Sequence, residues 1–160
     1  GRWVDAALHS MQISPQAAVP CLQAHGATAC TDITGFGLLG HTMEMAQASG
    51  CRVALHAGAI PLLDGALALA QAGISSSLQP ANVRLRRALR NADEFINDPR
   101  YPLLFDPQTC GGLLASVPWD HAKSLIAQLH AQGDTGAAVI GRVTAAGPVE
   151  ILLAPSPSAL

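Results

Sequence analysis

Residues 31–41 place a carboxylate, two hydroxyl groups and three glycines in one short stretch that leads into a helical pattern. The stretch reads Thr31-Asp32-Ile33-Thr34-Gly35-Phe36-Gly37-Leu38-Leu39-Gly40-His41. Asp32 offers a hard oxygen ligand, while Gly35 and Gly37 let the backbone turn sharply and leave its N–H groups open to an anion. This combination indicates a metal and phosphate site. The same pattern is also typical of closely packed glycines and of a helix cap, so both interpretations stand at this point.

A second segment, residues 106–114, again puts polar side chains and paired glycines before an apolar run. It reads Asp106-Pro107-Gln108-Thr109-Cys110-Gly111-Gly112-Leu113-Leu114, and between the two motifs lies Ile60-Pro61-Leu62-Leu63-Asp64-Gly65-Ala66. In this order the three segments resemble the C-terminal domain of selenophosphate synthetase (selenide, water dikinase). The resemblance runs from about Val4 to about Val143, which is nearly the whole chain.

The resemblance implies an α+β fold, a mixed β-sheet packed with helices, as in relatives of aminoimidazole ribonucleotide synthetase. It implies an ATP-dependent reaction of selenide and water that gives selenophosphate, AMP and phosphate, with Mg²⁺ as cofactor, for selenoprotein and seleno-tRNA synthesis. It further implies a partner in the protein's own N-terminal domain, which binds ATP, and a homodimer built mainly through those N-terminal domains.

The resemblance also transfers roles to single residues. Asp32 matches the family aspartate that joins the metal site from this domain. The residues expected to support the site or shape its cleft are Thr31, Thr34, Gly35, Gly37, Asp106, Gln108, Thr109, Gly111 and Gly112. Cys110 stands where the family usually has serine, and because a thiol is a weaker hydrogen-bond donor, no serine role is transferred to it.

No catalytic residue is assigned to this chain. The reactive cysteine or selenocysteine, the essential lysine and the other magnesium aspartates of the family belong to the N-terminal domain, which has no counterpart here. One carboxylate cannot hold several magnesium ions on a triphosphate. We therefore expect the isolated chain to fold and to be inactive.

Composition and charge narrow the class of protein. The chain has 160 residues, 49% of them hydrophobic, which is enough for one compact domain, expected over residues 1–154 with a mobile tail at 155–160. The formal charge is -2 with 12% charged residues, so no basic field is available to attract nucleic acid. With no apolar run long enough for a membrane span and no signal peptide, we expect a soluble, cytoplasmic protein.

Three smaller patterns favour ordinary structural roles. The four cysteines lack C-x-x-C spacing, which favours free reduced thiols over a zinc site or disulfides. His41 and Glu44 are spaced i, i+3, and a packed, hydrogen-bonded histidine is the favoured interpretation. Arginines 84, 86, 87 and 90 supply four of the nine cationic residues. A solvated helix face is favoured for them over a phosphate contact or an acidic partner.

The elements that must position these residues follow from periodicity and turn signals. Helices are predicted at 3–11, 15–25, 34–49, 62–72, 82–92 and 119–132. Strands are predicted at 27–33, 53–56, 112–117, 137–144 and 149–153, with 112–117 buried. Residues 73–80 are predicted as a loop. Ser14 and Thr34 are expected to cap helices, and Gly26 and Gly50 to end them.

Two other classes of function remain open from the sequence. One is another ATP-using relative with the same architecture, of the aminoimidazole ribonucleotide synthetase or thiamine phosphate kinase type. The other is a non-catalytic interaction domain that uses an apolar surface. The combination of the long first motif with Asp-Pro-Gln-Thr and Gly-Gly favours selenophosphate synthetase over the first of these; the second stays open.

Overall fold

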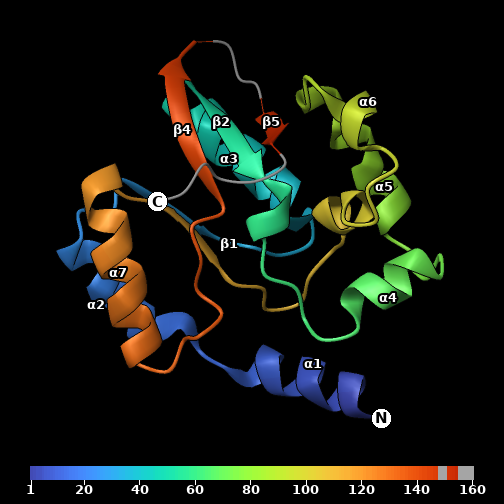
Figure 1. Cartoon of the computed structure of the whole chain (residues 1–160), viewed down its shortest axis with the longest axis horizontal. Helices are drawn as coiled ribbons and strands as arrows, with labels where there is room; N and C mark the ends of the chain where they lie inside the picture. The colour runs from blue at the N-terminus through green and yellow to red at the C-terminus, as the bar shows by residue number, and fades with distance from the viewer. Residues whose placement is uncertain (148–150, 155–160) are drawn as a thin grey trace.

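The structure, a computed structural model, describes residues 1–147 and 151–154. Its helices and strands are interspersed along the chain (Figure 1), and the fold is α+β, as the sequence predicts. The predicted tail at 155–160 lies outside the described residues, as do the first two residues of the strand expected at 149–153.

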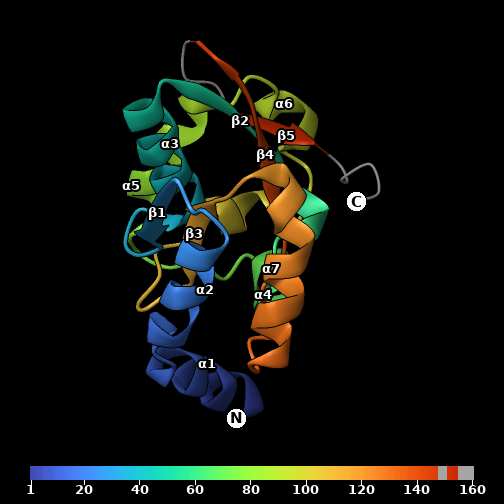
Figure 2. The same cartoon turned by 90° about the vertical axis from the view of Figure 1, so that its left-hand side faces the viewer.

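The N-terminal helices lie near their predicted positions. α1 spans Arg2–Gln12, and a 3-10 turn, η1 (Pro15–Ala17), leads into α2 (Ala18–Ala24). Ser14 caps this turn as expected, because its hydroxyl accepts the backbone N–H of Gln16 at 3.3 Å. α1 buries none of its residues and lies at one end of the molecule in both views (Figures 1 and 2).

A small antiparallel sheet holds the two motifs side by side. β1 (Ala29–Asp32) pairs with β3 (Leu113–Ser116), and Asp32 stands opposite Leu113 at the end of the ladder. α3 (Gly37–Ser49) follows β1 and ends at Gly50, whose left-handed backbone terminates the helix as predicted. The prediction of a buried strand at 112–117 is wrong, because every residue of β3 is half-buried. Among the described residues, β3 belongs to a two-stranded sheet.

The second sheet is mixed and has the strand order β4-β2-β5. β2 (Cys51–His56) is central, with β4 (Gly141–Ala146) antiparallel on one side and β5 (Ile151–Ala154) parallel on the other. The predicted strand at 137–144 is therefore shifted toward the C-terminus. α7 (Trp119–Ala131), which matches its prediction closely, connects the two sheets in sequence and lies beside α2 (Figures 1 and 2).

The middle of the chain departs most from prediction. The elements are η2 (Ala57–Ala59), α4 (Ala66–Gln71), α5 (Gln79–Val83), η3 (Arg84–Ala88), α6 (Ala92–Phe95) and η4 (Tyr101–Phe105). The helix expected at 62–72 begins four residues late, and the loop expected at 73–80 already enters α5. The single helix expected at 82–92 is wrong, because Leu89 is extended and forms a parallel bridge with Ile151. Burial of Leu89 in the core outweighs its local helical propensity.

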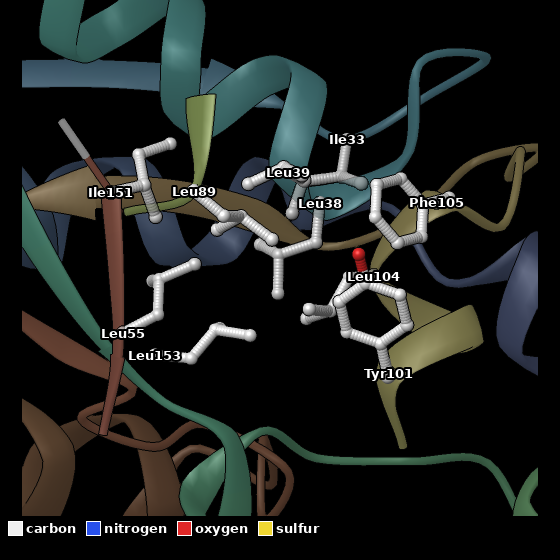
Figure 3. Close-up of a cluster of buried hydrophobic side chains, with 10 residues drawn as sticks. All are labelled: Ile33, Leu38, Leu39, Leu55, Leu89, Tyr101, Leu104, Phe105, Ile151 and Leu153. Atoms are coloured by element: carbon white, nitrogen blue, oxygen red, sulfur yellow. The ribbon is translucent and has the colours of Figure 1, made fainter. Parts of the chain in front are cut away.

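Two hydrophobic clusters hold these elements together. The larger joins α3, the β2–β5 pair and η4, and its buried members are Ile33, Leu38, Leu39, Leu55, Leu89, Tyr101, Leu104, Phe105, Ile151 and Leu153 (Figure 3). The smaller joins α2 and α7 through Cys21, Leu22, Leu125 and Leu129. The larger cluster contacts both motifs, because Ile33 belongs to the first motif and Phe105 immediately precedes the second.

Candidate functional site

Asp32 lies at the end of β1 with its side chain exposed to solvent. Thr31 beside it is half-buried, and its hydroxyl donates to the backbone carbonyl of Asp32 at 3.2 Å. Cys30, two residues earlier on the same strand, has a raised pKa, mainly because of partial burial and further because of the negative charge of Asp32. Asp32 is thus an accessible carboxylate held on a sheet edge, as a metal ligand requires.

The backbones of the two motifs are hydrogen-bonded to each other beyond the strand pair. The N–H of Ile33 donates to the carbonyl of Gly112 at 2.9 Å, and the N–H of Gly111 donates to the carbonyl of Ile33 at 3.0 Å. The N–H of Gln108 donates to the carbonyl of Thr34 at 3.1 Å. These bonds join the loop after Asp32 to the segment 108–112.

Gly37 serves close packing rather than anion binding. Its φ is +69°, and a Cβ atom there would lie 2.9 Å from the carbonyl oxygen of Asp106 and 3.0 Å from that of Leu104. Its N–H donates to the carbonyl of Thr34 at 3.0 Å. The expectation that this N–H is open to an anion is therefore wrong, because the turn itself uses it. Gly35, by contrast, is exposed with open space around it.

Thr34 does not cap α3, which begins three residues later after Phe36 without a side-chain cap. The backbone N–H of Thr34 instead donates to Nε2 of His41 at 3.0 Å, and its hydroxyl lies 3.2 Å from the same atom. Because a backbone N–H can only donate, Nε2 is the acceptor and the ring proton lies on Nδ1, which is 3.1 Å from Oε2 of Glu44. The predicted packed histidine is confirmed: buried His41 holds the first motif in place.

The remaining residues of the second motif differ in exposure. Asp106 and Gln108 are half-buried, as is Gly111, whereas Thr109 and Gly112 are exposed. Burial raises the pKa of the Asp106 carboxyl. Asp106 also borders an open hollow of about 350 Å³, together with residues of α4 and α5 such as Leu69 and Gln79. Asp106 therefore borders a hollow beside the motif, and Asp32 is not among the residues that line it.

Cys110 is exposed and has a φ of +53°, in the left-handed region that most residues avoid. The position makes the tight turn that lets Gly111 reach the carbonyl of Ile33. All four cysteines, each within the described part of the chain, are free thiols, as the sequence indicates.

Asn82 links the first motif to Phe105, the residue before the second motif, although the sequence alone assigns it no role. It is buried, and its amide nitrogen donates to the carbonyl of Gly35 at 2.8 Å and to the carbonyl of Phe105 at 3.1 Å. The only signal in the sequence was a polar residue in an otherwise amphipathic stretch, which does not show where the side chain points.

Within the described residues, 1–147 and 151–154, no group of three histidine, cysteine, aspartate or glutamate side chains is placed to hold a metal ion. Asp32 has the donor chemistry and the exposure that a Mg²⁺ ligand needs.

The fold and these two joined motifs define a class of protein. The chain belongs to the family of the AIR synthase related protein, C-terminal domain, whose model matches residues 6–153. Three similar proteins carry a more particular name. The chain is 40% identical over 153 residues to a selenide, water dikinase of Desulfitobacterium hafniense, which covers 94% of the chain and 43% of that protein. It is 42% identical over 120 residues to a selenide, water dikinase of Caldanaerobacter subterraneus, which covers 74% of the chain and 34% of that protein.

The third, selenide, water dikinase 2 of Peptoclostridium acidaminophilum, is 37% identical over 129 residues, which cover 79% of the chain and 36% of that protein. The resemblance read from the two motifs is thus confirmed. The chain spans between about a third and just over two fifths of the length of these relatives. Among the described residues, no helix is long and apolar enough to cross a membrane.

Proposed function

We propose that this chain is the C-terminal domain of an enzyme that makes selenophosphate from selenide, ATP and water and releases AMP and phosphate. The product would serve selenoprotein and seleno-tRNA synthesis. The names of the three relatives support this reaction, and so does the match of both motifs. The observation that carries the proposal is the backbone hydrogen bonding of residues 33–34 to residues 108–112, which presents Asp32 at an exposed edge.

Asp32 is the residue we propose as a Mg²⁺ ligand. Bound Mg²⁺ would neutralise charge on the phosphate oxygens of ATP. The other proposed residues position Asp32. Thr31, Thr34 and Gly35 lie beside it in the chain, and His41 holds Thr34 by accepting the backbone N–H of Thr34. Gly37 and Gly111 allow the close approach of the two motifs. Asp106, Gln108, Thr109 and Gly112 form the adjoining wall of the cleft or the domain interface.

The remaining machinery lies outside this chain in our proposal. The proposed reaction needs several ligands for the cations on the triphosphate and a group that handles selenide. The described residues supply one exposed carboxylate at this edge. We propose that the protein's own N-terminal domain supplies the ATP site and the reactive residue. We also propose a single domain over residues 1–154, a cytoplasmic location and a homodimer for the full-length enzyme.

The proposed function is tested by phosphorus NMR of ATP with selenide and Mg²⁺. The 160-residue chain alone is expected to give no selenophosphate signal. The same chain joined to an N-terminal domain of a related selenide, water dikinase is expected to give selenophosphate, AMP and phosphate.

Selenophosphate from the 160-residue chain alone would refute the proposal that the N-terminal domain supplies the ATP site and the reactive residue. A folded two-domain protein that gives no selenophosphate would refute the reaction itself. In that case the relatives of the aminoimidazole ribonucleotide synthetase or thiamine phosphate kinase type, or a non-catalytic interaction domain, would replace it.

A further inference from the structure

The four arginines of residues 84–90 are exposed, as the sequence predicts, but they do not lie on one regular helix. Because the chain changes from α5 to η3 and then becomes extended at Leu89, the side chains of Arg86, Arg87 and Arg90 are gathered around one hollow of about 320 Å³. The hollow lies on the side of the molecule where Figure 1 shows α5 and α6, and Asp93 of α6 also borders it. Among the described residues that border the hollow, the guanidinium groups of Arg86 and Arg87 already outnumber the single carboxylate of Asp93, so the hollow carries a net positive charge.

Tyr101 of η4 also borders this hollow, and it is a buried residue with 9% of its surface exposed. Its hydroxyl has no hydrogen-bond partner among the described residues. Figure 3 shows the ring beside Leu104 and Phe105, at one end of the larger core cluster. A buried hydroxyl without a partner is costly, so such a group in a native protein usually has a partner that the isolated chain does not show.

Two charged residues that border the hollow, Arg86 and Asp93, also influence the pKa of the Tyr101 hydroxyl. Burial raises the pKa of Tyr101 most, while Arg86 lowers it and Asp93 raises it. Charged groups from η3 and α6 therefore act on the phenol oxygen, which keeps its proton at neutral pH and can act as a donor.

We propose that this hollow binds a phosphate group, with the guanidinium groups of Arg86 and Arg87 as the charged donors and the Tyr101 hydroxyl as a neutral donor. Guanidinium groups present planar pairs of N–H donors that match phosphate oxygens, and a hydroxyl adds direction. The site is separate from the edge that carries Asp32 and does not depend on the proposed reaction.

The test is a titration of the 160-residue chain with inorganic phosphate and, in a second arm, with AMP, at constant ionic strength set with chloride. Amide chemical shifts report the binding site by NMR. We expect saturable shifts concentrated in residues 84–101. Saturation by phosphate identifies the free anion as sufficient, whereas saturation by AMP alone identifies the phosphate group of a nucleotide.

Variants separate a built site from diffuse positive charge. Arg86→Gln and Arg87→Gln are each expected to weaken binding by about tenfold, the loss expected for one charge-assisted contact. Arg84→Gln is the matched control, because Arg84 is an exposed arginine of the same 3-10 helix that does not border the hollow. It is expected to change the affinity less than about twofold. Tyr101→Phe keeps the ring and removes only the hydroxyl, and it is expected to weaken binding about fivefold.

Two results would overturn the proposal. The first is the absence of saturable shifts with both ligands. The second is an equal loss of affinity in Arg84→Gln and Arg86→Gln, which would mean that the segment attracts anions only through its overall charge. An affinity unchanged in Tyr101→Phe would remove the hydroxyl from the site.

Discussion

At the scale of single residues, the aspartates of the two motifs differ in their exposure to solvent. Asp32 is exposed on a strand end, while Asp106 is half-buried beside η4 and its carboxyl has a raised pKa. An exposed carboxylate is accessible to a cation, whereas a half-buried one carries a desolvation cost when ionised. The two residues therefore give different predictions, one for metal dependence and one for stability.

Asp32→Asn is expected to raise the Mg²⁺ concentration for half-maximal turnover in the two-domain enzyme by about tenfold, because the amide binds a hard cation less well than a carboxylate does. The thermal unfolding of the 160-residue chain is expected to stay unchanged, since the side chain is exposed. Asp134→Asn, at another exposed aspartate, is the control. A Mg²⁺ titration that coincides with that of the unsubstituted enzyme would remove Asp32 from the metal site.

Asp106→Asn is expected to raise the midpoint of thermal unfolding near neutral pH. The pKa of Asp106 is higher in the folded chain than in the unfolded chain, so the folded chain binds this proton more tightly. The resulting stability is fully present below the unfolded pKa and is lost as the pH rises through the folded pKa. The advantage of the variant should therefore shrink as the pH is lowered from about 7 to about 4. An advantage that stays constant over this range would contradict the desolvation of Asp106.

At the scale of elements, the loop after β1 and the end of η4 are held by side chains of the helices α3 and α5. His41 of α3 accepts from Thr34, and Asn82 of α5 donates to Gly35 and Phe105. Backbone carbonyls in a buried position need such partners because water does not reach them. The motifs thus depend on helices that follow them or lie between them in the sequence.

Asn82→Ala is expected to lower the free energy of unfolding by about 1–3 kcal/mol, the cost of leaving a buried carbonyl without its donor. Urea denaturation measures this change. Gln47→Ala removes an amide side chain from the exposed surface of α3 and is expected to change stability by less than about 0.5 kcal/mol. Equal effects of the two substitutions would show that Asn82 does not hold the motifs together.

At the scale of the whole molecule, the C-terminal strand completes the core that supports the site. β5 pairs in parallel with β2, which lies about 100 residues earlier, and Ile151 is fully buried in the larger cluster (Figure 3). The same residue bridges Leu89 and accepts the N–H of Arg90. The strand therefore fixes both the mixed sheet and the end of η3.

Ile151→Ala is expected to destabilise the chain by about 2–5 kcal/mol, because it opens a cavity where β2, β5 and Leu89 meet. Val143→Ala, on β4 with 49% of the residue exposed, is the control and is expected to cost less than about 1 kcal/mol. Denaturant unfolding of both variants measures the difference. A loss below 1 kcal/mol for Ile151→Ala would mean that β5 is not part of the cooperative core.

The sequence by itself determined the features whose causes are local. The helices α1, α2, α3 and α7 follow from apolar periodicity and end signals such as Gly50, and the motif strings identified the family. Backbone propensity and turn chemistry act over a few residues, so they are visible in a short stretch of sequence.

Only the tertiary structure decided the features that depend on distant partners. The sequence predicts a helix through Leu89, but the bridge to Ile151, 62 positions away, makes it extended. The sequence predicts Thr34 as a helix cap, but in the structure its backbone N–H donates to His41. Asn82 donates to carbonyl groups of residues 47 and 23 positions away in the sequence. The arginines gather around a hollow for the same reason. Burial and hydrogen bonding between distant segments outweigh local preference, and no short stretch of sequence carries that information.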